Sequence, residues 1–302
     1  MCLSRQEYWK TDLRRYGQWA VVTGATSGIG RAYADELAKR GLDIILVSRS
    51  EEKLKTVALE IEMLYGRQTR VIQTDFTEGP VIYPAITEKL HNLDIGILVN
   101  NVGMNYAETL MNFLDNPNPE QRITEVINCN ILSVTQMTRL ILPQMVERGK
   151  GLIINMSSEA ASQPQPMLSL YSATKIFVTH FSRCLTSEYG PLGVTVQCVA
   201  PFIVSTNMTN NPGPNGIIMR ASDFARAALN TVGHSDFTSG CFSHALQHVA
   251  LTIFFPGWFR LSSFGVRLTE KFASTQQKRE IMAMQPGALN ETDTSNSTMQ
   301  NK

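Results

Sequence analysis

Thr23-Gly24-Ala25-Thr26-Ser27-Gly28-Ile29-Gly30 joins a short apolar run at residues 20–22 to a segment with helical periodicity at residues 29–40. Glycines in such a turn let the backbone bend sharply and approach a ligand without a Cβ in the way. The free N–H groups and the dipole at the start of the following helix favour a pyrophosphate; a tight turn without a ligand is the alternative. In this strand–turn–helix context the spacing predicts a dinucleotide-binding turn. Its predicted cofactor-binding residues are Gly24, Thr26, Ser27, Gly28, Ile29 and Gly30.

Apolar runs and helix-like segments alternate along the rest of the chain. The predicted strands are residues 20–22, 44–47, 71–73, 95–99, 152–155 and 194–199. The predicted helices are residues 29–40, 51–65, 120–147 (bent or ended near Pro143) and 172–189. This alternation predicts the α/β class, with a doubly wound parallel sheet of the Rossmann type in a single domain. The strands carry few polar residues, as expected when helices cover both faces.

The length of 302 residues suits one large domain. We expect an N-terminal extension over residues 1–17 and a dinucleotide-binding catalytic domain over residues 18–270. A loop near residues 207–222 is expected to contact the substrate. Residues 271–302 form the expected C-terminal tail, which we predict to be disordered from about residue 285, where Asn, Thr, Ser and Gln predominate.

Composition argues against several classes of function. The formal net charge of +1 offers no general nucleic-acid surface. The five cysteines form no C-x-x-C pair, and the five histidines lack metal-ligand spacing, so neither a disulfide framework nor a metal site is expected. No apolar stretch reaches the length of about 18 residues that a membrane helix needs. Residues 249–255 are apolar but short, and either pack on the domain or lie at a membrane interface or substrate entrance.

Tyr171 and Lys175 have the spacing that proton transfer to a carbonyl requires. A carbonyl that receives a hydride must also receive a proton, so an acid must lie beside its oxygen. A tyrosine hydroxyl can donate this proton, although it holds it tightly at neutral pH. Lys175 lies four positions later on the same helix face, where its positive charge favours the phenolate. We therefore predict a catalytic pair, the alternative being two surface residues at chance spacing.

The end of the second predicted strand indicates which cofactor is used. It reads Val47-Ser48-Arg49-Ser50, with no acidic residue. A carboxylate there would accept a hydrogen bond from the ribose 2′-OH of NAD and repel a phosphate. Arg49 can instead pair with a 2′-phosphate through charge-assisted hydrogen bonds. The charge therefore favours NADP(H) over NAD(H).

The order of these motifs resembles the short-chain dehydrogenase/reductase family over roughly residues 18–257. The glycine spacing is G-x-x-x-G-x-G. The further motifs, each in the expected order, are Asn100-Asn101-Val102-Gly103, Asn130, Ser157-Ser158, Tyr171-Ser-Ala-Thr-Lys175 and residues 201–206.

This resemblance implies roles for individual residues. Ser158, thirteen positions before Tyr171, would hydrogen-bond the substrate oxygen, and Ser157 would be its structural neighbour. Asn130 would hold a water in a proton relay to Lys175, a role compatible with a buried amide that satisfies backbone groups. The further cofactor contacts that the resemblance implies are Asp75 near the adenine, Asn101, Gly103, Tyr171, Lys175, Val204 and Thr206.

Finer details are most similar to the branch of the 17β-hydroxysteroid dehydrogenases of types 3 and 12. Val102 stands where most of the wider family has alanine, and Pro201-Phe202 replaces Pro-Gly. Residues 129–143 and 204–209 look most like type 3, which implies reduction of a 17-ketosteroid such as androstenedione to testosterone. Similarity to type 12 would instead imply reduction of 3-oxoacyl-CoA in very-long-chain fatty acid elongation. A non-catalytic protein on the same fold is the third alternative, and Tyr171 argues against it.

The resemblance also carries expectations about assembly and location. The family often pairs through its long helices, which implies a homodimer. Relatives in this branch have an N-terminal hydrophobic anchor in the endoplasmic reticulum membrane, whereas the residues before the glycine turn are polar here. We expect the cytosolic face of the endoplasmic reticulum, with peripheral membrane contact and a lipid or steroid ketone as substrate; the cytosol is the alternative.

Overall fold

A computed structural model describes residues 11–284, with the side chains of residue 272 and residues 276–284 left aside. Its centre is a seven-stranded sheet in the order β3-β2-β1-β4-β5-β6-β9, and every neighbouring pair is parallel. The strands are β1 (Trp19–Thr23), β2 (Asp43–Ser48), β3 (Thr69–Gln73), β4 (Ile95–Asn100), β5 (Gly151–Met156), β6 (Val194–Val199) and β9 (Phe237–Thr238).

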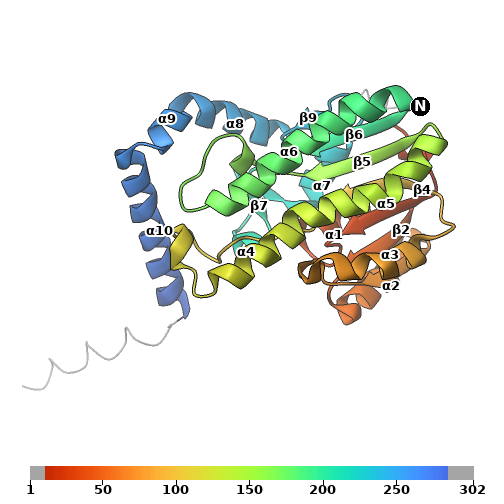
Figure 1. Cartoon of the computed structure of the whole chain (residues 1–302), viewed down its shortest axis with the longest axis horizontal. Helices are drawn as coiled ribbons and strands as arrows, with labels where there is room; N and C mark the ends of the chain where they lie inside the picture. Colours follow the sequence, from red (N-terminus) through yellow and green to blue (C-terminus); the bar gives the residue numbers. More distant parts are fainter. Residues whose placement is uncertain (1–10, 285–302) are drawn as a thin grey trace, which may run out of the picture.

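Helices cover both faces of this sheet (Figure 1). The helices of one face are α1 (Gly28–Lys39), α2 (Glu51–Tyr65) and α7 (Ala221–Leu229). The helices of the other face are α3 (Tyr83–Leu90), α5 (Ser133–Glu147) and α6 (Ser169–Tyr189), while α4 (Pro119–Ile127) precedes α5 and contacts α6. The predicted doubly wound α/β fold in a single domain is confirmed.

Successive side chains of the central strand β1 enter opposite halves of the core. In β1, Ala20 and Val22 pack with the helices of the first face, whereas Trp19 and Val21 pack with those of the second. All five residues of this strand are buried. An uninterrupted apolar strand is what a two-faced parallel sheet requires, because neither face meets water.

Three local differences from the sequence prediction stand out. The seventh strand, β9, was not predicted, because two residues carry no readable periodicity. A separate two-stranded sheet pairs β7 (Val204–Ser205) with β8 (Met219–Arg220). The long predicted helix is interrupted by a π-helical turn at Asn128–Leu132, while α5 continues through Pro143 to Glu147. The helix therefore does not end near Pro143.

Both ends of the described chain add to the domain. Residues 11–17, which we assigned to an N-terminal extension, include a 3₁₀ turn (Leu13–Tyr16) whose Leu13 and Tyr16 side chains are buried. At the other end the helices are α8 (Phe242–Phe254), α9 (Gly257–Arg260) and α10 (Ser263–Met284). The segment predicted to be disordered from about residue 285 lies outside the described residues. Between residues 11 and 284 no helix is long and apolar enough to span a bilayer.

Candidate active site

The predicted site residues gather at the carboxyl ends of the parallel strands. From β1 the chain continues to β2 and β3 on one side, and then crosses to β4, the neighbour of β1 on the other side. The direction in which strands are added to the sheet therefore reverses between β1 and β4. In open α/β sheets a crevice for ligands forms at such a reversal. The glycine turn follows β1, and Asn101 and Gly103 follow β4, so both segments flank this point.

The glycine turn is built so that its backbone lies close to neighbouring atoms. Gly24 has φ +67° and Gly28 has φ +57°, conformations that side chains with a Cβ rarely adopt. A Cβ on Gly30 would overlap the Gly24 carbonyl oxygen and Asn101 Nδ2. Ser27 precedes the first turn of α1, which holds no acidic residue. The N–H groups at this helix end are therefore suited to a pyrophosphate.

Thr23 joins this turn to the segment after β4. Its buried hydroxyl accepts hydrogen bonds from the backbone N–H groups of Asn101 (2.9 Å) and Val102 (3.0 Å). Asn101 Nδ2 donates in return to the Thr23 carbonyl oxygen at 2.9 Å. Sequence reasoning did not list Thr23 as a site residue, although it begins the glycine motif. Its position between two cofactor segments was the signal that could have found it.

Val204 and Thr206 follow β6 and lie close to the glycine turn. Val204 is buried in β7, and Thr206 precedes a 3₁₀ turn at Asn207–Thr209. A Cβ on Gly28 would lie 3.1 Å from Thr206 Cγ2, so these two segments face each other closely. The predicted substrate loop begins here and is tied to α8, where Gln247 Nε2 donates to the Ile217 carbonyl oxygen at 3.0 Å.

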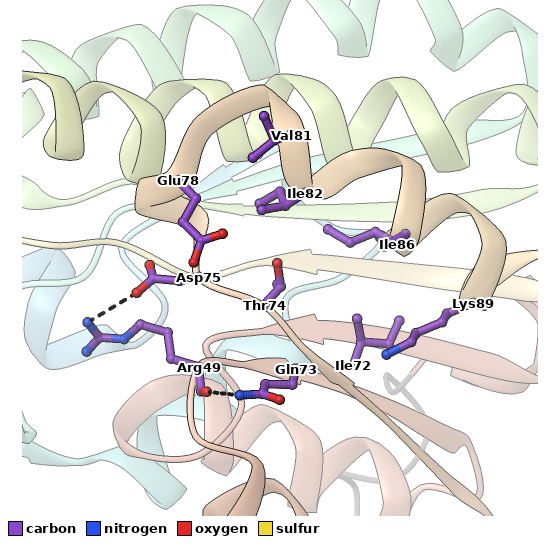
Figure 2. Close-up of a pocket in the computed structure, with 11 residues that line it drawn as sticks. Arg49, Ile72, Gln73, Thr74, Asp75, Glu78, Val81, Ile82, Ile86 and Lys89 are labelled. Atoms are coloured by element: carbon purple, nitrogen blue, oxygen red, sulfur yellow. Dashed lines mark hydrogen bonds and ion pairs between the residues drawn. The ribbon is translucent and has the colours of Figure 1, made fainter.

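Arg49 and Asp75 mark the opposite end of the crevice. The side chains lie 3.9 Å apart (Arg49 Nη1 to Asp75 Oδ2), and the Arg49 side chain is 74% exposed. Figure 2 shows them at one end of a cavity of about 480 Å³ between β3 and α3, with Lys89 at its far end. Asp75 also accepts hydrogen bonds from Thr77, which fix its carboxylate. Thr26 Oγ1 and Ser48 Oγ, 2.9 Å apart, connect the glycine turn to the end of β2 nearby.

The Lys175 ammonium and the Tyr171 ring lie together on α6. Lys175 is buried, and its Nζ is 5.7 Å from the centroid of the Tyr171 ring. Its Nζ donates to the Met156 carbonyl oxygen at 3.0 Å. A Cβ on Gly103 would lie 3.3 Å from this Nζ and 3.5 Å from Asn130 Oδ1. Three segments distant in the sequence therefore meet at the lysine.

Asn130 is held in the π-helical turn between α4 and α5. The side chain is fully buried and accepts a hydrogen bond from the Met104 N–H at 2.8 Å. Its Nδ2 donates to the Met104 carbonyl oxygen (2.9 Å) and to Thr174 Oγ1 (3.0 Å). Both amide hydrogens are thus engaged, so the side chain fixes the segment after β4 against α6. Single-turn π segments occur frequently at functional sites.

Ser157 and Ser158 have different surroundings. The Ser157 hydroxyl is buried, donates to the Lys175 carbonyl oxygen at 2.8 Å and lies 2.8 Å from Thr179 Oγ1. Ser158 is partly exposed at the end of β5, where its hydroxyl accepts from the Ala160 N–H at 3.1 Å. The hydroxyl of Ser158 is therefore the one of the two that can face a ligand.

Residues 18–215 match the sequence profile of a family described as short chain dehydrogenase. The chain belongs to this family. Very-long-chain 3-oxoacyl-CoA reductase from Anas platyrhynchos is 50% identical over 231 residues, which are 76% of this chain and 74% of that protein. 17-beta-hydroxysteroid dehydrogenase type 3 from Homo sapiens is 47% identical over 255 residues, 83% of this chain and 81% of that protein. The resemblance inferred from the motifs is confirmed.

Solved structures agree with this assignment. A short-chain dehydrogenase from Sphingobium yanoikuyae in complex with NADPH is 26% identical, with a TM-score of 0.68 over 92% of this chain and 99% of that chain. The present chain is an oxidoreductase of the same family.

A carboxylate beside the serine connects this short chain dehydrogenase site to α8. Glu159 is buried; its Oε2 lies 2.8 Å from His248 Nδ1, and its Oε1 accepts from Ser162 Oγ at 2.5 Å. In the sequence, His248 was considered only for metal-ligand spacing, and Glu159 was not singled out. An acidic residue directly after a predicted catalytic serine was the available signal.

Two other buried groups near the site are held in their neutral forms. Burial raises the pKa of the Cys129 thiol to about 11, which disfavours its thiolate. Burial also lowers the pKa of His244, whose Nδ1 accepts from the Phe202 N–H at 3.2 Å. Among residues 11–284 no group of three His, Cys, Asp or Glu side chains is arranged to hold a metal ion.

Proposed function

We propose that this short chain dehydrogenase reduces a lipophilic ketone with NADPH, and that Tyr171 donates the proton. The observation that carries the proposal is the buried Lys175 ammonium beside the Tyr171 ring, 5.7 Å from its centroid. A fixed positive charge there stabilises the phenolate left when the hydroxyl proton moves to the carbonyl oxygen. The Ser158 hydroxyl would hold that oxygen by a hydrogen bond, and Asn130 would hold a water in the relay that returns a proton.

The residues present fit NADPH. The close-packed glycine turn and the start of α1 would hold its pyrophosphate, and Arg49 would pair with its 2′-phosphate. Asp75 would lie near the adenine, while Asn101, Gly103, Val204, Thr206, Tyr171 and Lys175 would line the remainder. When bound, NADPH supplies the hydride that the carbonyl carbon receives. The NADPH complex of the Sphingobium yanoikuyae relative supports this choice of cofactor.

The substrate that we propose is a 17-ketosteroid, with androstenedione reduced to testosterone. Similarity of residues 129–143 and 204–209 to the type 3 branch supports it, as does 47% identity to the human type 3 enzyme. The second candidate is a very-long-chain 3-oxoacyl-CoA, supported by 50% identity to the reductase from Anas platyrhynchos. A non-catalytic role fits poorly with the placement of Tyr171 and Lys175.

The remaining expectations complete the proposal. Residues 18–270 form the catalytic part of the domain, to which residues 11–17 add buried side chains, and residues 207–222 contact the ketone. The protein pairs as a homodimer through its long helices and acts at the cytosolic face of the endoplasmic reticulum.

Consumption of NADPH by the purified protein tests the substrate. One reaction contains androstenedione and a second contains a long-chain 3-oxoacyl-CoA. Turnover of the steroid alone supports the type 3 activity, whereas turnover of the thioester alone assigns the protein to fatty acid elongation. Absence of turnover in both, with NADPH bound, would contradict both substrate proposals.

A further inference from the structure

One face of α8 exposes a continuous row of apolar side chains. Phe242, Leu246, Val249 and Ile253 follow the spacing i, i+4, i+7 and i+11, which places them along one side of a helix. All four are exposed, whereas His244 on the inner side is buried. The helix therefore presents an apolar surface outward as well as residues that pack inward.

A cluster of aromatic rings extends this surface beyond the end of α8. The Phe259 ring lies 5.7 Å from Phe255, 6.2 Å from Trp258 and 5.9 Å from Phe264, measured between centroids. Trp258 is 76% exposed, and Phe254, the last residue of α8, is 72% exposed. We call the row on α8 and this ring cluster, with Phe254, the C-terminal apolar face. Contiguous apolar surface of this kind commonly marks a binding site for a partner or a membrane.

The charged residues within the segment that forms the C-terminal apolar face have one sign, apart from the buried Glu159 that reaches His248 from the loop after Ser158. Residues 237–269 contain no Asp or Glu, although the whole chain contains 26. The same segment carries two cations: Arg267 is exposed, whereas the Arg260 guanidinium is partly buried and its Nε donates to the Phe255 carbonyl oxygen at 2.7 Å. Exposed aromatic and aliphatic side chains with flanking cations suit the head-group region of a bilayer that contains anionic lipid. A second copy of this face would offer no carboxylate to the arginines, so pairing of two copies here is disfavoured.

The C-terminal apolar face is joined directly to the loop behind Ser158. His248 on α8 contacts Glu159, and a Cβ on Gly257 at the start of α9 would lie 2.5 Å from Gln163 Oε1. Figure 1 shows α9 and α10 at the end of the molecule opposite α2 and α3. We propose that the C-terminal apolar face docks on the surface of an anionic lipid bilayer. Docking would bring the loop after Ser158 close to the bilayer, in which a lipophilic ketone dissolves.

Flotation with lipid vesicles tests this proposal on the full chain. Vesicles of phosphatidylcholine with phosphatidylserine are compared with vesicles of phosphatidylcholine alone, at low and high salt. We expect binding to the anionic vesicles that weakens with salt. The double variant Phe254→Ser/Trp258→Ser is expected to bind roughly tenfold more weakly or worse, because two large side chains no longer enter the lipid.

The matched control is Met63→Ser/Leu64→Ser on α2, where the side chains are 80% and 68% exposed. It should bind vesicles like the unchanged protein, and thermal unfolding should show that both variants are folded. Failure of the unchanged protein to bind, or equal losses in both variants, would overturn the proposal. The proposal would also be overturned if the unchanged protein bound no vesicles and formed a dimer that the Phe254→Ser/Trp258→Ser change dissociates. The face would then be a contact between two copies of the chain. Vesicle binding requires no turnover, so its failure is distinct from failure of the proposed ketone reduction.

Discussion

Lys175 and Glu159 show which residues of the site the sequence could predict. Lys175 was predictable because a spacing of four places it one turn from Tyr171 on the same helix face. The contact of Glu159 with His248 joins residues 89 positions apart and depends on how α8 folds back over the loop after β5. No local spacing carries that information. The roles of Asn130 and Ser158 came from the family resemblance, and their placement beside Lys175 and the end of β5 supplies the geometry.

Tyr171→Phe should abolish most ketone reduction while leaving the cofactor site intact. Loss of a positioned general acid lowers rates by roughly 10²- to 10⁴-fold. We expect kcat/KM to fall by this factor with little change in the NADPH dissociation constant. Tyr189→Phe, at the other end of α6, is the matched control and should leave both values unchanged. Equal turnover by the two variants would contradict the assignment of Tyr171.

His244 should make the stability depend on pH in the mildly acidic range. Burial lowers its pKa in the folded protein from the ordinary value of 6.5, so the unfolded chain takes up a proton first as the pH falls. The stabilisation is therefore complete above pH 6.5 and is lost below it, by at most about 1.4 kcal/mol per pH unit for one proton. His244→Asn, which can still accept from the Phe202 N–H, should flatten this part of the curve. Denaturant unfolding between pH 7 and 5.5 measures the effect, with the exposed His180→Asn as control; identical slopes would refute it.

Between elements, the site depends on turns and loops that hold neighbouring strands and helices together. The glycine turn was predictable, since few other residues adopt positive φ and permit so close an approach. The π-helical turn at Asn128–Leu132 was not, because one extra residue only shifts the phase of the apolar pattern and leaves a helix-like signal on either side. Pro143 misled the prediction: the buried side chains of Ile141 and Met145 hold α5 against the sheet across it.

Gly30→Ala should damage the joint between β1 and α1. Its Cβ would overlap the Gly24 carbonyl oxygen and Asn101 Nδ2, so the turn would have to move. We expect a loss of about 1–3 kcal/mol in unfolding free energy, as for overpacked sites, together with weaker NADPH binding. Gly190→Ala at the end of α6 has no neighbour within 4 Å and is the control. Calorimetry and cofactor titration compare the two, and equal behaviour would contradict the prediction.

Glu159→Ala should disturb the link between the loop after Ser158 and α8. Glu159 is a positioning residue, because it acts through His248 and Ser162. Misplacement of a reacting group by about 1 Å can lower rates by roughly 10²-fold, so we expect kcat/KM to fall ten- to hundredfold. The NADPH dissociation constant should not change, and Glu159→Gln should restore most activity since it keeps the shape and the acceptor for Ser162. If the alanine variant keeps full activity, the link has no role in catalysis.

In the whole molecule, the parallel sheet places the proposed cofactor contacts on one side, at the carboxyl ends of its strands. Alternating apolar segments were enough to predict this doubly wound arrangement, because parallel strands buried on both faces have few alternatives. The positions of α8 to α10 were not predictable, because these helices do not connect neighbouring strands of the sheet and the strand pairing therefore does not fix where they lie. Residues 249–255 were seen as apolar, but their exposure appears only in the structure.

Bound NADPH should stabilise the folded chain as a whole. At a concentration about 100 times the dissociation constant the gain is about 2.7 kcal/mol, which corresponds to a rise of roughly 5–10 °C in the unfolding temperature. NADH should raise the unfolding temperature less than NADPH at equal concentration. In the Arg49→Glu variant, NADH should instead give the larger rise. Arg183→Glu on exposed α6 surface is the control. Equal shifts with both cofactors in the unchanged protein would remove Arg49 from the proposed 2′-phosphate site.

The π-helical turn has a consequence for changes in chain length. An α-helix turns by about 100° per residue, so the extra residue at Asn128–Leu132 sets the rotation of α5 relative to α4. Deleting one residue there would restore a regular helix and rotate α5 by that angle about its axis. If α5 kept its buried Met137 and Ile141 against the sheet, Asn130 would rotate away from Lys175. If Asn130 stayed in place, Met137 and Ile141 would rotate away from the sheet. The middle of this helix therefore tolerates substitution far better than insertion or deletion, and alignments of diverging sequences should be free of gaps across it.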